Sequence, residues 1–162
     1  MYSKGMLSLK NYLPKIRNAA RALIIRDKKV LLLRKESDNL ETSYVLPGGG
    51  QNVGESLIEA LQRECVEEIA TKINVEDLLF VADYFKDKAI DPPVTTHLVE
   101  FIFKCNVPDS YIAKSGLSPD KHQVDVVWME LSKLKEIPLF PKALDSLLNT
   151  SQVESIYLGT IK

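Results

Sequence analysis

The residues with the clearest chemical capacity lie between positions 48 and 73, where a glycine-rich loop leads into a strongly charged segment. This segment carries Arg63, Glu64, Glu67 and Glu68, among other charged side chains. Glycines let a backbone turn sharply or approach a phosphate closely. Clustered carboxylates bind hard divalent cations such as Mg²⁺. Loop and acids together indicate metal-assisted chemistry on a phosphate-containing substrate.

The spacing of the acids predicts that residues 55–70 form a helix. At about 100° per residue, Glu64, Glu67 and Glu68 fall within roughly one quadrant of a helical wheel. Glu64 and Glu68 are a like-charge pair one turn apart, and a bound cation would reverse their repulsion. The neighbouring stripe is apolar and can pack on a sheet: Ile58, Leu61, Cys65 and Ile69. Arg63 is expected to pair with Glu59, and it could also reach Glu55.

An acidic pair after a Gly-rich turn can also be an ordinary solvated helix, but the complete spacing is more specific. Gly49, Glu55 and the run at residues 63–68 follow the pattern G-x5-E-x7-R-E-U-x-E-E, where U is a bulky apolar residue. This stretch closely resembles the signature of the Nudix hydrolases, the MutT-like family. The signature glycine and apolar residue that follow are Ala70 and Thr71 here. We therefore expect the helix to end differently and to run through to Lys72.

The resemblance implies hydrolysis of a pyrophosphate bond in a nucleoside diphosphate linked to another moiety. The implied cofactor is Mg²⁺ or Mn²⁺, which lowers the pKa of a bound water. The implied metal ligands are the Gly48 carbonyl, Glu64, Glu67 and Glu68. Catalytic roles fall to Glu64, Glu67 and Arg63, with Glu64 the first choice as general base. Glu55 and Arg63 would orient the loop and the ligating carboxylates.

Composition favours a single soluble domain. The chain has 162 residues and a net charge of −1, with no basic run typical of nucleic-acid binding. Cys65 and Cys105 form neither a disulfide framework nor a zinc motif, so a reducing cytoplasm is expected. Neither a membrane-spanning stretch nor a signal peptide is recognisable. We expect an N-terminal arm or edge element at residues 1–16 and one Nudix domain at residues 17–162. A homodimer is an open alternative, since the fold often dimerises.

The order of elements resembles the α+β Nudix fold, an α/β/α sandwich around a mixed β-sheet. A hairpin is expected from the apolar runs on either side of residues 27–29. Residues 107–121 are predicted to form an irregular segment without regular secondary structure. Strands are predicted at residues 19–25, 30–34, 44–46, 78–85, 96–105, 124–129 and 156–161. Besides the acidic helix, residues 131–137 are predicted as a short helix or turn and residues 141–149 as a helix, with Pro141 in its first turn.

Several further residues are candidates for substrate binding. Arg21 and Glu100 are charges within apolar strands, so they either face a cleft or lie on a solvent-facing side. Gly49 and Gly50 belong to the loop that would approach a phosphate. Other residues have both a functional and a structural interpretation. Asp120 and Asp125 could supply an additional catalytic acid or form a polar turn. His97 and His122 could bind substrate or be structural. Tyr84, Phe85 and Trp128 could stack on a base or pack in the core.

The substrate is the least determined feature. The runs at residues 17–35 and 97–105 are loosely similar to ADP-ribose pyrophosphatase-type Nudix proteins, which favours ADP-ribose or a related compound. A nucleoside triphosphate pyrophosphohydrolase that cleans the nucleotide pool is the second alternative. A non-catalytic nucleotide-binding or scaffold module is the third. Retention of all the charged signature positions favours an enzyme.

Overall fold

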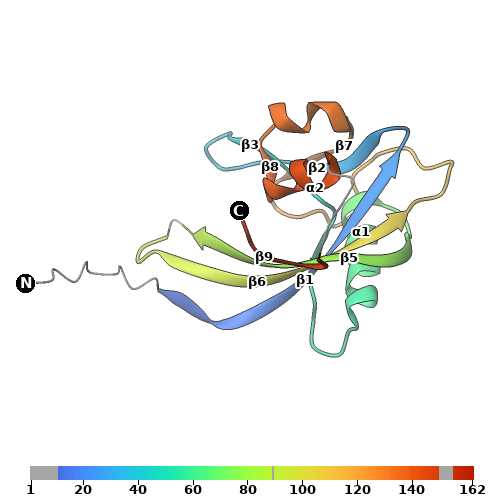
Figure 1. The fold of residues 1–162 in the computed structure, drawn as a ribbon. Coiled ribbons are helices and arrows are strands. Elements are labelled where there is room, and N and C mark those ends of the chain that lie inside the picture. Colours follow the sequence, from blue (N-terminus) through green and yellow to red (C-terminus); the bar gives the residue numbers. More distant parts are fainter. Residues whose placement is uncertain (1–10, 89, 150–154) are drawn as a thin grey trace, which may run out of the picture.

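Two long strands, β1 (Tyr12–Arg26) and β6 (Val94–Asn106), pair in parallel at the centre of a mixed β-sheet (Figure 1). The structure is a computed structural model that describes residues 11–88, 90–149 and 155–162. Within that part, the main path of the sheet runs β8-β3-β2-β1-β6-β5-β9, while β4 pairs with β1 and β7 with β2. The other strands are β2 (Lys29–Glu36), β3 (Thr42–Val45), β4 (Gly48–Gly50), β5 (Asn74–Lys88), β7 (Gln123–Glu130), β8 (Leu139–Phe140) and β9 (Tyr157–Ile161).

The predicted hairpin joins β1 to β2 through a two-residue turn. Asp27 and Lys28 both have positive φ, 50° and 58°, and Arg26 pairs with Lys29 across the turn. Positive φ at both central residues matches the right-handed twist of the flanking strands. The strands are longer than their apolar runs, since β1 begins at Tyr12 and includes part of the predicted arm. Residues 1–10 of that arm lie outside the described part.

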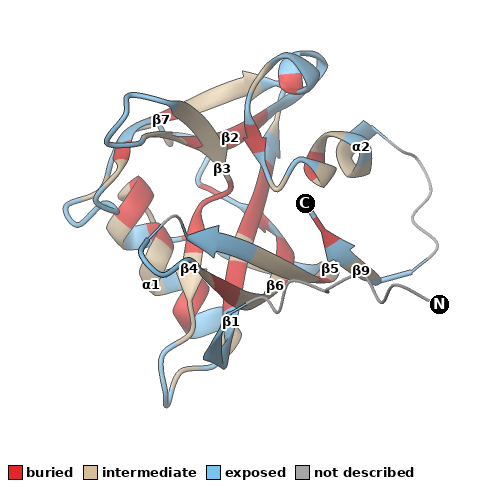
Figure 2. Cartoon of the chain, turned by 90° about the vertical axis from the view of Figure 1, so that its left-hand side faces the viewer, coloured by how far each residue is buried: buried red, intermediate tan, exposed pale blue. Residues whose placement is uncertain are grey.

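Helices cover both faces of the sheet. The α1 helix (Leu57–Ile69) buries Leu61, Cys65 and Ile69 in one apolar cluster. On the other face, Leu144 of α2 (Ala143–Asn149) and Leu134 of a 3₁₀ helix, η1 (Leu131–Glu136), belong to a second cluster. Figure 2 shows α1 and α2 on opposite sides of the buried β1. This layering confirms the predicted α+β class and α/β/α sandwich.

Both ends of α1 differ from the prediction. The helix begins after Ser56, whose side chain accepts from the Glu59 N–H while the Glu59 carboxylate accepts from the Ser56 N–H. Such a capping box satisfies N–H groups that lack partners within the helix. The expected extension to Lys72 is wrong, because Ala70 already has φ 58° and ψ 29° and ends the helix. Ala70 thus adopts the left-handed conformation for which the signature normally supplies glycine.

Two other segments lie next to α1 or to the strands that surround it. Gly48–Gly50, expected as a loop, form the short strand β4, which pairs with residues 19–21 of β1. Residues 107–122 are irregular, as predicted, and connect β6 to β7. None of the helices in the described part is long and apolar enough to cross a membrane.

Candidate active site

The glycine strand β4 lies directly against the acidic helix α1. A Cβ atom added to Gly49 would be 2.5–2.7 Å from the carboxyl atoms of Glu64. At Gly48, where φ is +125°, an added Cβ would be 2.1 Å from the Ala20 carbonyl oxygen. These close approaches explain why the loop needs glycine at both positions. They bring the Glu64 carboxylate against the backbone of β4.

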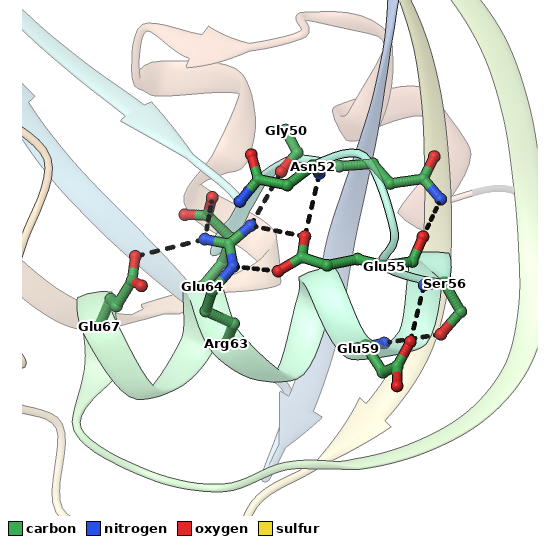
Figure 3. Close-up of polar contacts among 9 residues, drawn as sticks. Gly50, Asn52, Glu55, Ser56, Glu59, Arg63, Glu64 and Glu67 are labelled. Carbon is green, nitrogen blue, oxygen red and sulfur yellow. Dashed lines mark hydrogen bonds and ion pairs between the residues drawn. The ribbon is translucent and has the colours of Figure 1, made fainter.

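Arg63 connects the loop to the acids of α1 (Figure 3). Its Nε and Nη2 donate to the two carboxylate oxygens of Glu55 at 2.6 and 3.0 Å. The same Nη2 donates to the Gly50 carbonyl at 3.0 Å, and Nη1 lies 3.0 Å from Glu64 Oε1 and 3.5 Å from Glu67 Oε2. Arg63 therefore pairs with Glu55 rather than with Glu59, which forms the capping box. Hydrogen bonding to Arg63 lowers the pKa of Glu55 to about 2.

Glu68 is the most buried acid of the helix, with 4% of its surface exposed. Its Oε2 accepts from the Gly48 N–H at 2.8 Å. Burial raises the pKa of Glu68 to about 7, although that hydrogen bond and the charges of Lys35 and Arg21 lower it. Positive charge near this carboxylate is favourable because its ionised form has lost solvation.

Arg21 and Glu100 meet each other beside the loop. The Arg21 Nε donates to Glu100 Oε2 at 2.9 Å, Nη2 lies 3.3 Å from Oε1, and Nη1 donates to the Gly48 carbonyl. Glu100 is only 3% exposed, so the interpretation of a solvent-facing strand acid is wrong. Arg21 likewise faces the interior of the site. Parallel pairing of β1 with β6 brings these two residues together.

The donor set suits a hard divalent cation by chemistry, because it consists of carboxylate and carbonyl oxygens. Glu64 and Glu67 bind Arg63, Glu68 binds the Gly48 N–H, and the Gly48 carbonyl accepts from Arg21. As they stand, no three acidic, histidine or cysteine side chains of the described residues converge closely enough to hold an ion. Arg63 contacts one oxygen of each of Glu64 and Glu67, Oε1 and Oε2 respectively, so the second oxygen of each carboxylate lies outside these contacts.

A cavity of about 370 Å³ borders this centre. Its lining residues include Arg21, Lys35, Tyr84, Phe85, Lys86, Glu100 and Phe140. Lys35 forms an ion pair with Asp120, and its positive charge also lowers the pKa of Glu68. Burial and the nearby charges of Lys35 and Arg21 lower the pKa of Lys86. The cavity thus presents cationic and aromatic groups next to the acidic helix.

The remaining candidates lie in other surroundings. His97 contacts Asp83 at 2.6 Å and stacks on Phe85, while the Tyr157 hydroxyl donates to Asp83. His122 lies 3.9 Å from Asp38. Two further candidates make structural contacts: Asp125 accepts from the Val126 N–H, and Trp128 packs on the core beneath the Arg26 guanidinium.

The sequence interpretation missed Lys35, Lys86 and Phe140 as cavity residues. Lys35 lies two positions after the apolar run at residues 30–33, and the pair of cations that follows this run was a usable signal. Lys86 and Phe140 carry no comparable signal, because their position depends on how β5 and β8 enter the sheet.

The glycine strand lies against the acidic helix, as expected from the signature. A NUDIX domain model matches residues 15–149, so the chain belongs to the NUDIX family. An ADP-ribose pyrophosphatase from Methanocaldococcus jannaschii is 30% identical over 89 residues, which are 55% of this chain and 50% of that protein. The chain thus matches about half the length of this curated relative.

Solved structures show the same fold at low identity. The MutT protein from Methanosarcina mazei Go1 has a TM-score of 0.59 at 22% identity, covering 87% of this chain and 93% of that one. An ADP-ribose pyrophosphatase from Streptococcus suis has a TM-score of 0.56 at 18% identity, covering 87% and 97%. The predicted family is confirmed.

Proposed function

We propose that this protein is a divalent-cation-dependent pyrophosphohydrolase that cleaves a nucleoside diphosphate linked to another moiety. The observation that carries the proposal is the position of Glu64 and Glu68 against the Gly48–Gly50 strand. Arg21, which lines the cavity, donates to the Gly48 carbonyl and so connects this strand to the cavity. Mg²⁺ or Mn²⁺, when bound, would neutralise charge on the diphosphate and supply an acidified water.

The residues of the chain divide the remaining work. Glu64, Glu67 and Glu68 would hold the cation together with the Gly48 carbonyl, and Glu64 is the proposed acceptor of the proton from the attacking water. Arg63, fixed by Glu55, orients Glu64 and Glu67 for this purpose. Arg21, fixed by Glu100, supplies positive charge at the boundary between the acids and the cavity.

ADP-ribose or a related compound is the favoured substrate. The M. jannaschii relative is named an ADP-ribose pyrophosphatase, and so is one of the similar structures. The cavity offers Tyr84, Phe85 and Phe140 for an aromatic base, with Lys35 and Lys86 near the phosphates. A nucleoside triphosphate pyrophosphohydrolase remains the second candidate, because MutT proteins are also among the similar structures. The predicted cytoplasmic location and homodimer remain predictions.

A nucleotide panel with Mg²⁺ or Mn²⁺ tests the reaction. We expect metal-dependent hydrolysis that falls at least about 100-fold in Glu64→Gln and Glu67→Gln, because each loses a charged oxygen ligand. Glu76→Gln, which changes a glutamate outside the cavity lining, is the matched control. Release of AMP from ADP-ribose would identify the favoured substrate, whereas pyrophosphate release from a triphosphate would identify the second. Binding of nucleotides without any turnover would instead support the non-catalytic module.

A further inference from the structure

The 107–123 segment, which comprises the connection from β6 to β7 and the first residue of β7, supplies hydrogen-bond donors to the C-terminal end of α1. The last carbonyls of a helix have no partners within it. Here the Ser118 N–H reaches the Glu67 carbonyl at 3.3 Å, and the Gly116 N–H reaches that of Glu68 at 3.0 Å. The Gln123 Nε2 donates to the same Glu68 carbonyl at 2.7 Å. The helix end is thus closed by a distant part of the chain.

A fourth donor completes this closure. The Tyr111 hydroxyl donates to the Ile69 carbonyl at 3.0 Å. Together these bonds reach three consecutive carbonyls, those of residues 67–69. Two of the three belong to Glu67 and Glu68, whose carboxylates are the candidate metal ligands. The segment therefore holds the backbone of both residues while their side chains serve the site.

The approach at Gly116 leaves no room for a side chain. A Cβ atom added there would lie 2.1 Å from the Glu67 carbonyl oxygen and 2.7 Å from that of Val66. Contacts this short with backbone atoms cannot be relieved by a side-chain rotation, so either the helix end or the segment must move. Gly116 was not recognised in the sequence, because nothing local to it marks contact with α1.

The segment is itself anchored to the sheet at both ends. Near its start, Arg26 donates to the carbonyls of Val107, Pro108, Asp109 and Tyr111, at 2.8–3.4 Å, and its guanidinium lies 5.1 Å from the Trp128 ring centre. Near its end, Asp120 pairs with Lys35 of β2, and the Glu36 N–H donates to the His122 carbonyl. A support fixed at two places can define the position of a helix end that finishes on a left-handed alanine.

We propose that the 107–123 segment positions Glu67 and Glu68 for cation binding, through its hydrogen bonds to the end of α1. The inference rests on the proposed function, because it concerns the same cation. The residues that act are Gly116, Gln123 and Tyr111. They touch neither the ion nor the substrate, and they act through the backbone that carries the ligands.

Mn²⁺ binding to the full chain, titrated by electron paramagnetic resonance without nucleotide, tests this role. Gly116→Ala should lower Mn²⁺ affinity roughly tenfold, the lower range for residues that orient metal ligands. Tyr111→Phe and Gln123→Met should lower it in the same direction, and they serve if Gly116→Ala does not fold. Leu117→Ala is the matched control, because Leu117 is fully exposed beside Gly116 and should keep the native affinity.

A second variant separates positioning from general stability. Ala70→Gly, added to Gly116→Ala, should restore the melting temperature by relieving the left-handed alanine, yet Mn²⁺ affinity should stay low. Affinity that returned with the melting temperature would overturn the inference, and so would native affinity in all three segment variants. A native chain that bound no Mn²⁺ would refute the proposed function and this inference together, whereas native binding with unaffected variants would refute the inference alone.

Discussion

At the residue scale, the pair of Arg63 with Glu55 fixes the loop onto the helix by two short contacts. Hydrogen bonding to Arg63 holds the pKa of Glu55 at about 2, below its ordinary value of 4.5. A carboxyl with a lowered pKa stabilises the folded state above pH 4.5, and this contribution is lost as the pH falls towards 2. Acid should therefore weaken the junction between loop and helix.

Glu55→Gln tests this expectation. The variant should melt at a lower temperature than the native protein at pH 7, because Arg63 loses its charged partner. The difference should shrink below pH 4.5 and approach zero as the pH falls through 2, because Glu55 then becomes protonated in the native protein as well. Thermal unfolding followed by circular dichroism over this pH range gives the measurement. Glu136→Gln, at an exposed position of η1, should show no such trend, and an equal trend in both variants would contradict the assignment.

The sequence predicted which residues lie close together only where these residues are near each other along the chain. The run from Glu55 to Glu68 lies on one loop and one helix, so helical geometry alone placed its members near each other. Arg21 and Glu100 are 79 positions apart, and they meet only because β1 and β6 pair in parallel. Alternation within a strand cannot say which face is covered, so neither their burial nor their pairing was available from the sequence.

At the element scale, the end of α1 offers a direct test. Ala70 is held at φ 58°, a conformation that is unfavourable for every residue with a Cβ atom. Ala70→Gly should therefore raise the free energy of unfolding by about 1 kcal/mol, measured by urea denaturation. Ala60→Gly is the matched control, because Ala60 is buried within the same helix and its loss should destabilise the protein by about 1 kcal/mol. Destabilisation by both variants would contradict the interpretation.

The helix end also shows why element boundaries were less predictable than elements. Without the signature glycine, the local sequence favoured a longer helix, because alanine is a good helix former. The observed end depends on donors from residues 111–123, which no local pattern reveals. The start of α1 can be predicted more easily from the sequence, since Ser56 followed by Glu59 has the spacing of a capping box.

At the scale of the whole molecule, both cysteines report on global unfolding. Cys65 and Cys105 are at most 1% exposed, on α1 and β6. Burial raises the pKa of Cys105 to about 12 and that of Cys65 well above its ordinary value. Since the thiolate is the reactive species, neither should react with Ellman's reagent at pH 8 in the native protein. Both should react in denaturant.

Ser132→Cys provides the positive control for this measurement, because position 132 is exposed in η1. That thiol should react rapidly in the native state while the two native thiols do not. Rapid reaction of either native thiol would contradict the packing of α1 on the sheet. If the chain binds Mn²⁺ as proposed, the ion should slow the native thiols further in mild denaturant, because it stabilises the folded state.

The layers of the fold followed from the pattern of apolar runs, whereas the cavity did not. Alternating strands around one amphipathic helix are consistent with few architectures, and the signature selected among them. The cavity is lined from several strands and from Phe140 and Pro141, so its shape follows from packing of distant segments. Substrate preference depends on the shape of this cavity and therefore has to be measured.

The parallel pairing of β1 with β6 has a consequence for the order in which the chain is made. All the charged signature positions have been synthesised by residue 68, yet Glu100, which holds Arg21 in place, comes later, and so does the segment that closes α1. A nascent chain that ends between α1 and β6 therefore carries the acids without their scaffold. Contacts between such distant residues form late because the chain must close a large loop. The acids of the site would thus gain their supporting contacts only after residue 123 has been made, long after the acids themselves.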